Sequence, residues 1–128
     1  MLKKLFRFVY KNDLVLHILD EIQQCIAQEY LDKYIEQITY IDKFSWVLNK
    51  EVNLYFSQTM PDSLNIKLYQ ERRIANLIMT DIFDKTYKMK IYFVHGHIFS
   101  LESNLPFKGL LIEEIKDISI ICSKDVSI

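Results

Sequence analysis

The sequence predicts an α+β fold in which N-terminal helices pack on one face of an antiparallel sheet of about five to six strands. Apolar residues recur with a helical period up to about residue 38. The period then changes to two, and consecutive β-type runs separated by short turns follow. No linker, low-complexity tract or internal repeat interrupts the chain, so residues 1–128 are expected to form a single domain.

Two helical segments open the chain. Residues 2–11 place apolar side chains at helical spacing opposite Lys and Arg, which is typical of a short amphipathic helix that ends near Asn12. From Asp13 to about Ile38 the pattern is again helical. One stripe of this segment is apolar and comprises Val15, Ile18, Leu19, Ile22 and Ile26. After Glu29 the apolar positions spread around the helix, so a kink or a second short helix is expected there.

The alternation with a period of two begins at Phe44. Residues 44–57 predict a hairpin with a tight turn at Asn49-Lys50, followed by a turn at 59–63 and a short strand at 64–68. The remaining predicted segments are a charged link at 70–73, strands at 74–83, 87–94, 97–102 and 117–122, turns at 84–86 and His95-Gly96, and a loop at 104–109. The clearest alternation puts Tyr87, Met89, Ile91 and Phe93 on one face and Lys88, Lys90 and Tyr92 on the other.

The formal net charge of −1 conceals an uneven distribution. Residues 1–12 carry four basic residues and no acid, whereas residues 13–42 carry seven acids and a single Lys. The rest of the chain is mixed, with a basic excess over residues 43–101 and an acidic excess over residues 102–128. The near-neutral total argues against a general nucleic-acid binder. The chain has 2 Gly, both isolated, which excludes a Gly-rich phosphate-binding loop.

The residues that usually carry catalysis do not form a recognisable set. Cys25 and Cys122 are expected to be reduced, buried packing residues, and no Ser lies in a Gly-flanked elbow. His95 and His97 have no further ligand at close spacing, so neither a metal nor a cofactor is expected. No run reaches the roughly 20 apolar residues of a membrane span. These features predict a cytoplasmic protein without a catalytic site.

Carboxylates supply an alternative from another class. Asp81 and Asp84 flank a turn, Glu102 ends a strand, and Glu113-Glu114 are adjacent. A pocket between the sheet and its helices is a usual place for a small-molecule site. The alternative is therefore a small pocket enzyme or ligand-binding domain in which a buried carboxylate or His, namely Asp81, Glu102 or His97, is the general base.

Two stretches carry a resemblance to a known class of proteins. The first is Val52-Asn53-Leu54-Tyr55-Phe56 followed by Met60-Pro61-Asp62, and the second is the strand, Gly turn and short strand of residues 91–102. Their order after a helical N-terminal region, over roughly residues 30–105, resembles small bacterial α+β immunity proteins. Such proteins are encoded beside secreted polymorphic toxins, including those of contact-dependent growth inhibition systems. The resemblance implies a cytosolic, non-enzymatic protein that binds and neutralises one cognate toxin domain.

A partner-binding surface follows from this resemblance together with the charge pattern. If the toxin is basic, the acidic helix face would steer its association through Asp20, Glu21 and Asp32, together with Asp13. Surplus tyrosines on the open face of the sheet, Tyr55 and Tyr92, have the composition of an interface core. These six residues are the candidate partner-binding residues. Neither nucleic acid nor a membrane is an expected partner, although the basic segment 1–11 could instead contact an anionic membrane, and no oligomeric state is predicted.

Overall fold

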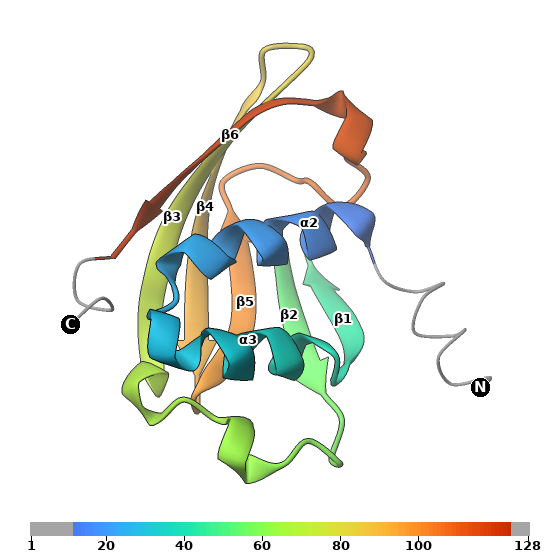
Figure 1. Ribbon diagram of the computed structural model, residues 1–128. Coiled ribbons are helices and arrows are strands. Elements are labelled where there is room, and N and C mark those ends of the chain that lie inside the picture. The colour runs from blue at the N-terminus through green and yellow to red at the C-terminus, as the bar shows by residue number, and fades with distance from the viewer. Residues whose placement is uncertain (1–11, 124–128) are drawn as a thin grey trace.

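The computed structural model describes residues 12–123, and it consists of one layer of helices on one face of a twisted sheet (Figure 1). The helices are α2 (Asp13–Glu21) and α3 (Leu31–Ile38). The strands are β1 (Ile41–Val47), β2 (Glu51–Phe56), β3 (Glu71–Asp81), β4 (Thr86–Val94), β5 (His97–Ser103) and β6 (Ile115–Cys122). The predicted α+β class is confirmed, with six strands. The predicted helix at residues 2–11 lies outside the described residues.

The sheet has the order β1-β2-β5-β4-β3-β6, and every neighbouring pair is antiparallel. The β1–β2 hairpin joins the β3–β4–β5 meander because β2 pairs with β5, where Val52 lies opposite Leu101. On the other side of β5, the same Leu101 lies opposite Ile91 of β4. All three side chains are buried, so the register aligns the apolar face of the sheet across the middle strands.

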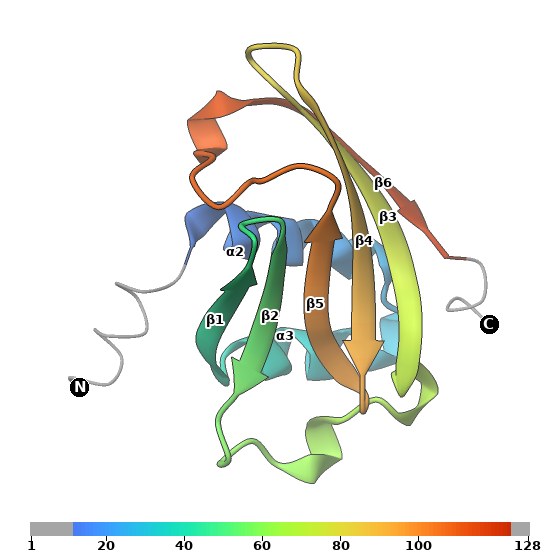
Figure 2. The same cartoon turned by 180° about the vertical axis from the view of Figure 1, so that it is seen from behind.

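The helices cover this apolar face. The predicted stripe on α2 is buried, and so is the predicted alternating face of β4. Tyr34 of α3 stacks on Phe93 of β4 with ring centroids 6.1 Å apart, and its hydroxyl donates a 2.6 Å hydrogen bond to the carbonyl of Leu19. One aromatic side chain thus links both helices to the sheet. Among residues 12–123, no helix covers the opposite face of the sheet (Figure 2).

The helical region divides earlier than the sequence indicates. Two 3₁₀ turns, Ile22–Cys25 and Gln28–Tyr30, follow α2, and the chain is extended between them at Ile26. The expected second helix is therefore present, but the break precedes Glu29. The backbone N–H of Ala27, which has no helical partner at this break, donates a 3.2 Å hydrogen bond to the hydroxyl of Tyr69.

The strand predicted at 64–68 was wrong. Residues 62–69 form two 3₁₀ turns because their backbone bonds to the His95-Gly96 turn instead of to a strand. The N–H of Ile66 donates to the carbonyl of Gly96 at 2.8 Å, and Gln37 of α3 donates to the same carbonyl at 2.9 Å. The predicted link at 70–73 is instead the start of β3, which pairs with β4 from Glu71 onward.

The first hairpin turn lies one residue earlier than predicted. Leu48 and Asn49 have φ values of 52° and 58°, and Lys50 N–H donates to the carbonyl of Val47 at 3.0 Å. Two left-handed residues match the twist of a hairpin. Asn tolerates this conformation well, whereas Leu rarely adopts it, which explains why the residue pattern pointed to Asn49-Lys50. The second turn, at His95-Gly96, was placed correctly.

The prediction of two reduced thiols was also wrong. Cys25, which ends the 3₁₀ turn after α2, forms a disulfide with Cys122, the last residue of β6, across a sequence separation of 97. The edge strand β6 pairs with β3 alone in the described part of the chain. The disulfide therefore attaches the end of an edge strand to the helical layer, a proximity that depends on where β6 returns in the sheet.

Candidate partner-binding surfaces

The buried sides of the two helices fix the direction of their acidic side chains. Asn12 caps α2 by accepting a 3.0 Å hydrogen bond from Val15 N–H, and the apolar side of the helix then packs on the sheet. On α3 the buried positions are Tyr34 and Gln37. The acidic residues therefore occupy the outer side of the helical layer. We call them the acidic helix surface: Asp13, Asp20, Glu21, Glu29, Asp32 and Glu36.

This surface contains four of the six candidate residues. Asp13, Asp20 and Asp32 are exposed, and Glu21 is half-buried with its carboxylate 3.9 Å from His17 Nε2. Lys33 is the one Lys or Arg between positions 12 and 40, against six acids. This excess of carboxylates produces a negative potential over the layer.

The two candidate tyrosines lie on the opposite face of the molecule. Tyr55 alternates with the buried Leu54 on β2, and Tyr92 alternates with buried residues on β4, so both side chains lie on the open face of the sheet. Tyr55 is 45% exposed and contacts Phe99 edge-on, with centroids 5.8 Å apart. Lys43 Nζ lies 5.8 Å from the Tyr55 ring centroid. The six candidates therefore form two separate surfaces.

The open face also carries charged residues that were not among the candidate partner-binding residues. A hollow of about 350 Å³ is lined by Tyr92 and Phe99 together with Glu51, Glu102 and Arg73. Glu51 of β2 lies directly opposite Glu102 of β5, and Glu102 lies opposite Lys90 of β4. The alternation that identified Tyr92 as outward-facing also applies to these neighbours. They would have been found by listing the whole outward face of each strand.

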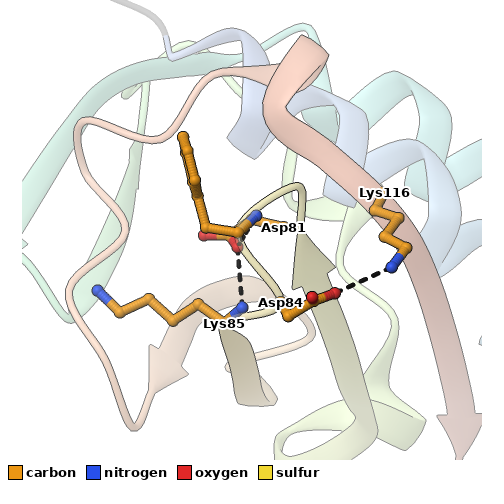
Figure 3. Close-up of polar contacts among 5 residues, drawn as sticks. Asp81, Asp84, Lys85 and Lys116 are labelled. Atoms are coloured by element: carbon orange, nitrogen blue, oxygen red, sulfur yellow. Dashed lines mark hydrogen bonds and ion pairs between the residues drawn. The ribbon is translucent and has the colours of Figure 1, made fainter.

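The first of the three candidate bases, Asp81, has a structural role at the β3–β4 turn. Its side chain is buried, and Oδ1 accepts hydrogen bonds from the N–H groups of Phe83 and Lys85, both at 2.9 Å. Oδ2 accepts a 3.1 Å hydrogen bond from the Tyr87 hydroxyl. Figure 3 shows the bond to the Lys85 backbone, while the Lys85 side chain extends away from the carboxylate.

These bonds determine the protonation of Asp81. Burial alone would raise the pKa of the carboxyl, but the hydrogen bonds from Lys85, Phe83 and Tyr87 outweigh it and hold the pKa below its ordinary value. A general base at neutral pH is usually a carboxylate whose pKa is raised. The hollow of about 960 Å³ beside Asp81 is open, and it is lined by both cations and carboxylates: Lys85, Lys108, Asp81 and Glu114. The hydrogen bonds and the lowered pKa therefore fit a structural role, in which Asp81 fixes the β3–β4 turn.

The other two candidate bases lie elsewhere. His97 is half-buried against Phe56, with ring centroids 4.5 Å apart, and burial lowers its pKa. Glu102 lies on the open face of the sheet, where its Oε2 accepts a 3.5 Å hydrogen bond from the Ser100 hydroxyl. In the part of the chain that the structure describes, no three His, Cys, Asp or Glu residues lie close enough to hold a metal ion.

Comparisons place no further constraint on these surfaces. Among residues 12–123, no helix is long and apolar enough to cross a membrane. Comparison of the chain with protein-family models, with curated proteins and with solved structures finds no match.

Proposed function

We propose that this protein is a non-enzymatic immunity protein that binds a cognate bacterial toxin domain and neutralises it. The observation that carries the proposal is the acidic helix surface, where six carboxylates and one Lys lie on the outer side of α2, α3 and the turns between them. The inner side of both helices is already used in the core. The outer side is therefore available for a partner.

The charge of this surface defines the kind of partner. Clustered carboxylates accelerate encounter with a basic protein and select against acidic ones. A nuclease toxin is basic around its active site because it must attract phosphate groups. An acidic protein that covers such a site excludes the substrate by position and by charge, without any chemical step of its own.

The place of action is part of the proposal. We propose the cytoplasm, because an immunity protein must meet the toxin where the toxin acts. The Cys25–Cys122 disulfide makes an oxidising compartment the alternative, since disulfides are rare in the cytosol. Fractionation of cells decides between the two. Recovery of the protein in the cytoplasmic fraction supports the cytoplasm, and recovery from an oxidising compartment contradicts it.

Co-expression tests the function itself. The toxin would be the C-terminal domain of the protein encoded beside this chain's gene, produced from an inducible promoter in cells with or without this protein. We expect survival only when both are present, and co-purification of the two chains from the surviving cells. A catalytically inactive toxin domain that fails to bind the purified protein would contradict the proposal.

A further inference from the structure

The open face of the sheet contains a second charged feature that the proposed function does not use. A groove of about 590 Å³ extends across four neighbouring strands, in the order β5, β4, β3 and β6. The residues that define it are Arg73, Ile78, Lys88, Lys90, Glu102 and Ile121. We call this feature the cationic groove, since it has three cationic side chains and one carboxylate.

The strand register spaces the cations regularly. Lys88 and Lys90 lie two residues apart on the outward face of β4, which separates them by roughly 7 Å along the strand. Arg73 of β3 lies opposite Tyr92, the next outward residue of β4. The three positive charges therefore follow one another along the direction of the strands, with Lys88 and Lys90 on β4 and Arg73 on β3 beside the next outward position.

Apolar side chains lie beside this row of charges. Ile78, opposite Lys88, is 37% exposed, and Ile121, which pairs with Asn76, is 59% exposed. Exposed Ile next to spaced cations suits a ligand whose carboxylates are carried on apolar stems, as in Glu side chains. An extended peptide with Glu at alternate positions matches the spacing of the cations, because its side chains also recur on one face about every 7 Å.

We propose that the cationic groove binds an extended acidic peptide segment of another protein, with Asp or Glu at alternate positions. Lys88, Lys90 and Arg73 pair with successive carboxylates on the face of the peptide that meets the sheet, and the methylene groups of the same acidic side chains contact Ile78 and Ile121. This surface faces away from the acidic helix surface, so the two can be occupied independently. The inference does not depend on the identity of a toxin.

The aromatic geometry disfavours single-stranded nucleic acid. The rings of Tyr55 and Phe99 contact each other edge-on, which competes with base stacking. The residues that define the cationic groove include no aromatic ring, whereas exposed Ile78 and Ile121 suit the apolar stems of a peptide.

The probe is a fluorescein-labelled octapeptide that alternates Glu with Val, and binding to the full chain is followed by fluorescence anisotropy. The test variant is Lys88→Glu with Lys90→Glu, at two exposed positions. The matched control is Lys85→Glu with Lys108→Glu, which makes the same charge change at exposed positions of the other hollow. Circular dichroism establishes that each variant is folded.

We expect the groove variant to weaken peptide binding at least tenfold and the control variant to change it less than twofold. Lys88→Arg with Lys90→Arg should retain binding within about threefold, since the charge is kept. Equal weakening by both reversals, or no binding to the wild-type chain, would overturn the proposal. It would also be overturned by tighter binding of an eight-residue oligothymidylate, or by self-association of the chain that displaces the peptide.

Discussion

Reduction of the Cys25–Cys122 disulfide should lower the stability of the protein substantially. The bridge closes a loop across a sequence separation of 97. A cross-link of this length restricts the unfolded chain by about 4.7 kcal/mol at 25 °C in the chain-entropy model. An unfolding entropy of about 2.1 cal/mol/K per residue for a chain of 128 residues converts this free energy to a fall in Tm of about 17 °C.

The assay is differential scanning calorimetry of the oxidised protein and of protein reduced with a phosphine. Cys25→Ala with Cys122→Ala is the control, because it removes the cross-link together with both sulfur atoms. It should melt within a few degrees of the reduced wild type and should not respond to the reductant.

Loss of the bridge should also act locally. Strand β6 pairs with β3 alone among the described residues, so its free end at Cys122 should open first. Amide exchange in β6 should then accelerate more than exchange in the central strand β4. Oxidised and reduced protein that melt within about 3 °C of each other would refute this reasoning, as would two free thiols in protein purified without reductant.

Two further predictions concern turns. The carboxylate of Asp81 has a depressed pKa in the folded protein. Its contribution to stability is therefore present above the unfolded-state pKa near 4 and is lost as the pH falls through the lower folded-state value. Urea denaturation from pH 6 to pH 2 should show this loss in the wild type and not in Asp81→Asn. Gly96 has a φ of +85°, and an added Cβ would lie 2.8 Å from a backbone nitrogen, so Gly96→Ala should cost about 2 kcal/mol or more in urea denaturation. Gly109→Ala is the control, because its Cβ would have no neighbour within 4 Å, and an equal loss in both variants would contradict the argument.

The sequence predicted those parts of the fold that depend on local pattern. The alternation from Tyr87 to Phe93 identified the buried face of β4, and the helical stripe of residues 15–26 identified the side of the first helix that packs on the sheet. Both are set by the period of the side chains, which is independent of what lies opposite. The turn at His95-Gly96 could be predicted because it also depends on local sequence, since Gly readily adopts the positive φ that a two-residue hairpin turn requires.

The features that were missed depend on distant parts of the chain. Cys25 and Cys122 meet because β6 pairs with β3 instead of with its neighbour in sequence, and no spacing rule encodes that choice. The segment at 64–68 has strand-like alternation, but its backbone bonds to the turn at Gly96, which is 30 residues away from Ile66.

The candidate partner-binding residues show a different limit of prediction from sequence. The acids were assigned to a helix face, and Tyr55 and Tyr92 to the open face of the sheet, and these placements agree with the structure. In a two-layer fold those faces point in opposite directions, so the six candidates lie on two separate surfaces. The same alternation places Lys88 and Lys90, which line the cationic groove, on the open face.

The most direct measurement of the central claim is the association rate with the toxin domain encoded beside this chain's gene. Stopped-flow traces over a range of ionic strength would compare the wild type with the double variant Asp20→Lys with Glu21→Lys. The matched control is the double variant Glu71→Lys with Asp117→Lys, since it changes the charge equally at exposed positions on strands β3 and β6. The account predicts that the helix-surface variant associates at least tenfold more slowly at low salt, with a flatter salt dependence, and that the control does not. Equal association rates for all three proteins would contradict it.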